Sequence, residues 1–340
     1  MEHTRAASMP KTKRLVRAAT LMLFAACNRG SHRARSEPAT SQAAEMAPRS
    51  SHSAANLPST ELVVPTRLLS LPESAYSISL ALDGEVAYLL TRSAAYRLAA
   101  GKPPQKIELD LGIGPVLTDS GFVYWSKGAI WNAGKDGSHP RRLAALPGQP
   151  EYFVASHEGM AWLDRGSDGL YKIQSLNGQK PRVLVADQGE ISALNMIHEW
   201  VFFVLRAKDK SWRIGRVHVG SSKLEYTDSK TGSTPAMLAG TETPVYYDMG
   251  SSEIRQLNPD LKGEQIWLRD FVCSPIHQAR NIYCNRVEGF YEVLADSRET
   301  KLLWYGSRET ITTIRANSKQ VVWTVDTGPD QLAVNRLPVE

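Results

Sequence analysis

The side chains best suited to chemistry are scattered along this sequence rather than grouped. The histidines that fall at or near expected turns show neither HxxxH nor HExxH spacing and have no cysteine at metal-ligand distance; they are His139, His157, His198, His218 and His277. No GxSxG stretch is present to expose a nucleophilic serine, although a Ser-His-Asp triad assembled by the fold stays open. We therefore expect structural or solvated histidines, and neither a catalytic residue nor a metal nor a cofactor.

The segment from Asp164 to Gly169 contains two aspartates in a glycine-rich run. It lacks the alternating carboxylates and the terminal Glu of an EF-hand loop. A tight turn is the better interpretation.

Cys273 and Cys284 are the only cysteines after residue 27. If their flanking residues form two paired strands joined by a turn near His277–Arg280, with Ile276 opposite Asn281, the two cysteines face each other. We therefore predict a Cys273–Cys284 disulfide, which would persist in an oxidising compartment. Two buried free thiols are the alternative.

The third cysteine, Cys27, follows a basic segment and the short apolar run from Ala18 to Ala26, which is too short to span a bilayer. This pattern is typical of an export signal over residues 1–26, with Met9 as an alternative start. The ending Ala25-Ala26-Cys27 resembles the lipobox of bacterial lipoproteins, with Phe24 where that family usually has Leu. The resemblance implies a lipid on Cys27, and a cleaved secretory peptide with an incidental Cys27 is the alternative.

Residues 28–60 contain Ser, Ala, Pro or Thr at 19 of 33 positions and no aromatic residue. Such a composition cannot bury enough apolar surface to offset the entropy lost on ordering. We predict that residues 27–60 form a lipidated, disordered tether and that residues 61–340 form the folded domain. Asn28 after the cysteine resembles lipoproteins sent to the outer membrane of a Gram-negative bacterium.

A repeat with an aromatic residue in a short β-rich run fills the folded part. Its aromatic residues are separated by 36, 38, 41, 44, 36 and 40 positions; they are Tyr88, Tyr124, Trp162, Phe203, Tyr247, Tyr283 and Trp323. A period near 40 made of strands is the spacing of propeller blades. We predict an all-β, seven-bladed β-propeller, with six blades as the alternative, and we read residues 121–146 as one four-stranded unit.

The two ends of the folded part complement each other. The last repeat contains three strand candidates, at 311–316, 320–325 and 331–337, while a spare β-rich run at 67–71 precedes the first repeat. We predict that Arg67–Leu71 completes the last blade, because this pairing removes two exposed edges. The eight tryptophans are expected between blades, with a sugar-binding surface as the alternative for a few of them.

Three segments resemble the YWTD repeats of low-density-lipoprotein-receptor propellers, in degenerate form. They are Tyr124-Trp125-Ser126-Lys127, Ala161-Trp162-Leu163-Asp164 and Trp323-Thr324-Val325-Asp326. The family has six blades, and most copies here lack its Asp. The resemblance implies a ligand-binding or scaffolding propeller in the extracytoplasmic space.

The distribution of charge argues against nucleic acid. The chain has a net charge of +5, but residues 1–26 hold +4 and residues 28–60 hold +2, which leaves the folded part at −1. We therefore expect a monomeric envelope lipoprotein that binds a protein, peptide or glycan without catalysis. A propeller enzyme, such as a lyase, hydrolase or quinone-dependent dehydrogenase, is the alternative.

Five bases recur three or four residues after the aromatic of a blade: Arg92, Lys127, Arg165, Arg206 and Arg286. The fifth and seventh copies have Gly250 and Asp326 instead. Since these positions follow the second strand of each blade, we predict a basic ring on one face that favours an anionic partner. Solvated loop charges without a common target are the alternative.

Overall fold

The computed structural model describes residues 65–71, 79–91, 94–177, 180–235, 238–240, 242–270, 273, 276–286, 289–305, 310–328 and 331–339. The predicted signal peptide, lipidated Cys27 and tether lie outside these residues. In the part of the chain that is described, no helix is long and apolar enough to cross a membrane.

The described residues form seven four-stranded antiparallel sheets, and the prediction of seven blades is confirmed. The six-bladed alternative is wrong. In each of the first six blades, four consecutive strands pair in sequence order.

The strands of the first three blades alternate with short turns. They are β2 (Ser79–Asp83), β3 (Val86–Leu90), β4 (Ala94–Leu98) and β5 (Gln105–Glu108); β6 (Ile113–Thr118), β7 (Gly121–Ser126), β8 (Ala129–Ala133) and β9 (Arg141–Ala145); and β10 (Tyr152–Ala155), β11 (Met160–Arg165), β12 (Tyr171–Asn177) and β13 (Lys180–Asp187). Residues 121–146 therefore hold only three strands of the second blade. The fourth, β6, lies before Gly121, where the run Ile113–Thr118 has no aromatic residue to mark it.

The remaining blades repeat this order. They contain β14 (Glu190–Ile197), β15 (Trp200–Arg206), β16 (Trp212–His218) and β17 (Leu224–Tyr226); β18 (Leu238–Ala239), β19 (Val245–Asp248), β20 (Glu253–Leu257) and β21 (Glu264–Leu268); β22 (Ile276–Gln278), β23 (Ile282–Arg286), β24 (Gly289–Val293) and β25 (Thr300–Trp304); and β26 (Thr310–Ala316), β27 (Gln320–Gly328) and β28 (Gln331–Pro338).

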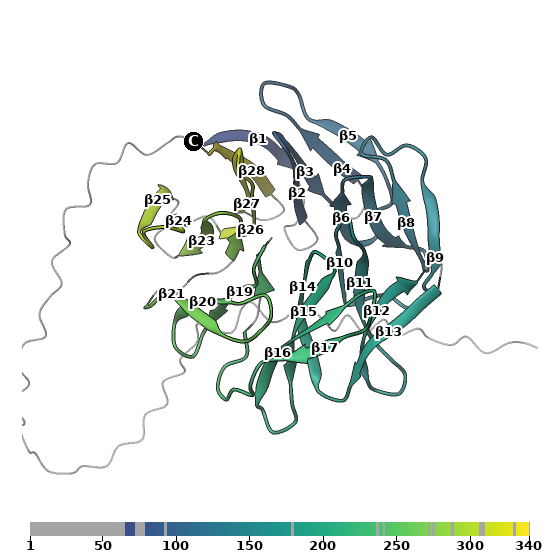
Figure 1. The fold of residues 1–340 in the computed structure, drawn as a ribbon. Helices are drawn as coiled ribbons and strands as arrows, with labels where there is room; N and C mark the ends of the chain where they lie inside the picture. Colours follow the sequence, from purple (N-terminus) through teal and green to yellow (C-terminus); the bar gives the residue numbers. More distant parts are fainter. Residues whose placement is uncertain are drawn as a thin grey trace, which may run out of the picture. The chain divides into compact units, whose positions relative to one another are not determined.

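The seventh blade takes its fourth strand from the other end of the domain. The strand β1 (Thr66–Leu71) pairs antiparallel with β28, from Thr66 opposite Arg336 to Leu71 opposite Leu332, and Figure 1 shows the two strands side by side. The predicted closing strand is confirmed. The first strands of successive blades contact one another in turn, and β26 contacts β2, so the ring of blades closes.

The core lies between neighbouring blades, because alternate residues of each strand face opposite neighbours. In the second blade, Phe122 and Tyr124 pack toward the first blade, while Val123 packs toward the third. The same alternation places Phe203 against the third blade and Phe202 against the fifth. Trp162, Trp212 and Trp323 are fully buried in these layers, as expected for packing between blades.

The predicted disulfide between Cys273 and Cys284 is present, with Cα atoms 5.6 Å apart and both side chains buried. Its predicted register is wrong. Ile276 lies opposite Cys284 rather than Asn281, and His277 lies inside β22 rather than in the turn. The hairpin turn falls at 279–281 instead, so Cys273 reaches Cys284 from the segment before β22.

Candidate binding surface at one edge of the propeller

One edge of the sheets collects two kinds of loop. Each second strand ends there and turns into the third strand, and each fourth strand ends there before the chain enters the next blade. This follows from the antiparallel order of every sheet, since the fourth strand runs opposite to the first. We call this the connection edge. Loops on a rigid scaffold are where binding residues concentrate.

The structure brings the predicted basic residues to this edge, as far as it describes them. Lys127 lies in the turn between β7 and β8, and Arg165, Arg206 and Arg286 are the last residues of β11, β15 and β23. Arg92 lies outside the described residues.

Acidic residues accompany these bases on the connection edge. The Lys127 ammonium is 3.0 Å from a carboxylate oxygen of Asp110, and its hydrogen bond lowers the pKa of that carboxyl. Arg206 lies opposite Glu190 across the β14–β15 pair, so their side chains share one face of the sheet. The edge is therefore a mixture of both signs of charge at these positions.

Aromatic rings cover two of the guanidinium groups. Arg165 lies over Tyr171, with 5.3 Å between the guanidinium carbon and the ring centroid. Arg286 lies 5.6 Å from the centroid of Tyr291. Such stacking holds a guanidinium in one orientation while its edge can still donate hydrogen bonds.

A group of carboxylates lies where the third and fourth blades begin. Loss of water around Glu151 raises the pKa of its carboxyl, and the charges of Asp164 and Glu190 raise it further against the opposing effect of Arg165. The neighbouring Tyr152 also has a raised pKa, mainly because its hydroxyl is partly removed from water.

Three of the most exposed large apolar side chains also lie on the connection edge. They are Tyr152 at the start of β10, Met249 in the turn after β19 and Tyr305 after β25, with 45%, 50% and 59% of their surface exposed. An exposed aromatic or Met side chain contributes apolar contact to a bound partner.

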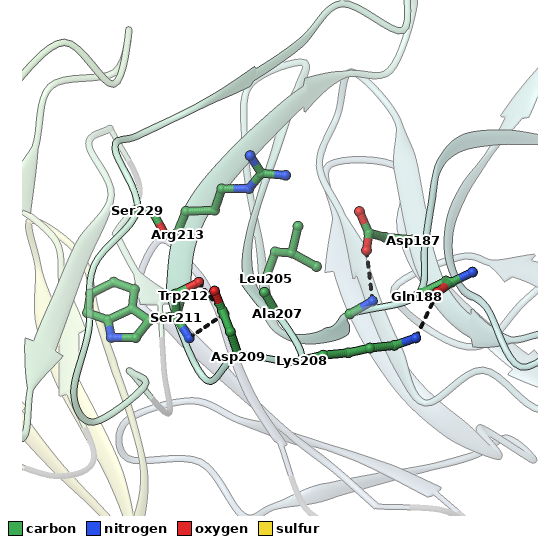
Figure 2. A pocket seen from close by; sticks show the side chains of 11 residues that line it. Asp187, Gln188, Leu205, Ala207, Lys208, Asp209, Ser211, Trp212, Arg213 and Ser229 are labelled. Carbon is green, nitrogen blue, oxygen red and sulfur yellow. Dashed lines mark hydrogen bonds between the residues drawn. The ribbon is translucent and has the colours of Figure 1, made fainter.

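The connection edge of the fourth blade also contains a pocket of about 530 Å³. It lies between the end of β13, at Asp187, with the link to β14, and the β15–β16 turn, which contains Lys208 and Asp209. Figure 2 shows Arg213 and Asp187 on either side of Leu205 and Ala207, with Lys208 below them. The volume falls in the range of small-molecule sites.

Sequence reasoning missed this pocket. Its walls come from two polar turns, Asp187-Gln188-Gly189 and Lys208-Asp209-Lys210-Ser211, that are ordinary turn sequences when read separately. In both turns an aspartate accepts a backbone N–H two residues later, at 2.7 Å for Asp187 and 2.9 Å for Asp209. The sequence held no signal that the two turns face each other.

The histidines of the described residues lie apart from this edge. His157 and His198 occupy turns between first and second strands, while Glu158 lies 3.4 Å from one ring and 3.7 Å from the other. Among the described residues, no group of three His, Cys, Asp or Glu side chains is arranged to hold a metal ion.

His277 differs from the exposed histidines. Its Nε2 lies 3.3 Å from the carbonyl oxygen of Ala316 in the next blade, and a carbonyl accepts only from a protonated nitrogen. Burial lowers the pKa of His277 to about 3, helped by the nearby charge of Arg315. The ring is therefore neutral and serves the packing of the sixth and seventh blades.

Comparison with solved structures agrees with this architecture. The structure titled "AfRom2 CNH domain" matches with a TM-score of 0.52 and 8% identity over 81% of this chain and 99% of that chain. "Crystal structure of Nidogen/Laminin Complex" matches with a TM-score of 0.45 and 13% identity over 65% of this chain and 90% of the other. At such low identity the first likeness speaks for the fold alone. No protein-family model and no curated protein matches the chain.

Proposed function

We propose that this protein is a non-catalytic binding or scaffolding module that engages its partner through the connection edge of the propeller. The observation that carries the proposal is the gathering, on that one edge, of a pocket, four basic residues and three exposed apolar side chains. A broad face with both charged and apolar groups suits a protein, peptide or glycan partner better than a single reaction centre does.

We place this module in the cell envelope, held to a membrane by a lipid on Cys27. The disulfide supports an oxidising, extracytoplasmic compartment. The basic segment, the short apolar run and Ala25-Ala26-Cys27 support export and lipidation, and Asn28 favours the outer membrane. The Ser/Ala/Pro tether would let the propeller stand away from the lipid surface.

A triple substitution tests the binding edge. Replacing Arg165, Arg206 and Arg286 together by Ala removes three bases that end strands on this edge. The residues of the core between the blades are left unchanged. We expect weaker capture of an anionic partner from envelope extract, with an unchanged melting temperature.

The matched control replaces three bases away from the connection edge, Lys135, Arg182 and Lys319. Arg182 contributes hydrogen bonds to Val219 and Gly220, so the melting temperature of the control is measured alongside. Equal capture by the two triple variants would contradict a binding role for the connection edge.

A further inference from the structure

The pocket of the fourth blade holds two charges of each sign that do not neutralise one another. Asp187 accepts the Gly189 N–H, and Asp209 accepts the N–H and the hydroxyl of Ser211. Lys208 donates to the amide oxygen of Gln188 at 2.9 Å, and the Arg213 guanidinium lies 3.7 Å from the centroid of the Tyr226 ring. None of the four forms an ion pair with another residue in the described part of the chain.

Some charged side chains elsewhere in the propeller are held in ion pairs. Arg255 of the fifth blade, for example, pairs with Glu253 and Glu264, and Lys230, in the segment after β17, also pairs with Glu264. The four charges of the pocket, in contrast to these pairs, remain available to a ligand. Leu205, which is nearly buried, provides an apolar part of the pocket wall.

A ligand with a single sign of charge would pair with only half of these groups and would be repelled by the others. A ligand that carries both an ammonium and a carboxylate pairs with groups of both signs at once. We propose that this pocket binds a small zwitterion of the amino-acid or short-peptide class. The carboxylates of Asp187 and Asp209 receive its ammonium, Arg213 and Lys208 receive its carboxylate, and an apolar side chain lies against Leu205.

This inference rests on the proposed function in one respect, since it places a ligand on the connection edge. It names the chemistry of one site there, and that site does not include Arg165, Arg206 or Arg286. If the pocket binds no zwitterion, the result of the triple-variant experiment is therefore unaffected. If the triple variant keeps full capture, the result of the pocket experiment is likewise unaffected.

Calorimetric titration of the full-length protein tests the pocket with four forms of one tripeptide. Ala-Leu-Ala with free ends is compared with its N-acetylated form, its C-terminal amide and the form blocked at both ends. We expect saturable binding of the free peptide and an affinity about tenfold lower or more after either block, because each block removes one charged end of the peptide and the charge-assisted contacts made to it. Free leucine in a parallel titration shows whether one amino acid is enough for binding. Tighter binding of either zwitterion than of the blocked peptides supports the proposal.

Three single variants locate the site. Asp187→Asn keeps an oxygen for the Gly189 N–H but loses the charge, Arg213→Gln removes the guanidinium, and Lys208→Ala removes an exposed side chain whose loss cannot unfold the domain. Each variant is expected to bind the free peptide several-fold more weakly than wild type does. Asp136→Asn, in a turn of the second blade, should keep wild-type affinity. Equal binding of the doubly blocked peptide, wild-type affinity in all three variants, or no saturable heat up to about 1 mM peptide would overturn the proposal.

Discussion

Single side chains determine how each blade meets its neighbour. Ser79 donates to the Pro115 carbonyl of the second blade, Asn195 to the Gly240 carbonyl of the fifth, and His277 to Ala316 of the seventh. Each of these contacts satisfies a carbonyl on the next blade with a polar side chain. Where that side chain can titrate, the contact between blades depends on pH.

His277 is the residue for which this dependence has a clear sign. The unfolded chain takes up a proton on this ring near pH 6.5, while the folded chain does so only at about pH 3. The free energy of unfolding therefore falls as the pH drops below 6.5, by about 1.4 kcal/mol per pH unit from this group. His277→Gln keeps a donor for Ala316 and should lose this part of the slope.

Urea unfolding at pH 7.5 and pH 5.0, on wild type and on His277→Gln, measures the effect. The wild type should lose about 2 kcal/mol more than the variant between these two conditions. Carboxylates titrate in both proteins and cancel in the comparison. Parallel losses in the two proteins would mean that His277 is not held neutral by the fold.

The disulfide is the second feature that belongs to single residues. Replacing Cys273 and Cys284 together by Ser should lower the free energy of unfolding by about 2–4 kcal/mol, because the open chain gains conformational freedom when unfolded. Part of the loss comes from placing two hydroxyls in a buried site. Titration of thiols in denatured, unreduced wild type must show neither cysteine free, and chemical unfolding of the variant gives the magnitude.

The polar segment after β17 differs from the corresponding segment of the other blades. The segment after β17 turns back so that Lys230 exchanges backbone hydrogen bonds with Trp212, at 2.8 and 2.7 Å. Its ammonium then lies 2.9 Å from the hydroxyl of Tyr246 in the fifth blade and pairs with Glu264. A long polar stretch that looks like a loop thus joins the fourth blade to the fifth.

The strand β1 is the element whose removal should matter most for closure. Leu69 and Leu71 pack against the core between the seventh and first blades, while Ser70 is exposed. Replacing both leucines by Ala should lower the free energy of unfolding by about 2 kcal/mol or more, since buried apolar contacts are lost. Ser70→Ala, in the same strand, should change it by less than about 0.5 kcal/mol.

Guanidinium unfolding of the two variants makes this comparison. A shift in the midpoint for the double variant only, with the same denaturant dependence as wild type, is the expected result. If the double variant were as stable as Ser70→Ala, the pairing of β1 with β28 would contribute nothing to closing the ring.

At the scale of the whole molecule, the seven blades form a closed ring in which each blade buries two faces. The fold itself implies no chemistry, because propellers host both binding proteins and enzymes. The proposed role therefore depends on where the chain is placed in the cell as much as on its surface. We propose that the amino-terminal region decides that placement.

Replacement of the predicted lipidation site tests the placement directly. Cys27→Ser leaves the propeller unchanged but removes the thiol that would carry the diacyl group. We expect wild type to enter the detergent phase and take up labelled fatty acid, and the variant to remain in the aqueous phase unlabelled. Detergent partition and acyl labelling of the variant at wild-type levels would reject the lipid anchor.

The sequence by itself determined the number of blades and the closing strand, because both follow from local signals. An aromatic residue about every 40 positions marks one blade, and a spare run at the front with a strand missing at the back implies closure. The face on which a residue lies was decided only by the tertiary structure. Tyr246 and Tyr247 look equivalent as sequence, yet one packs toward the fourth blade and the other toward the sixth. In a strand of period two, a shift of one residue exchanges the two faces. The register of β22 against β23 depended on where the short hairpin turn falls, at 279–281. Only the fold brought the two polar turns together around the pocket, so neither feature could be derived from the sequence.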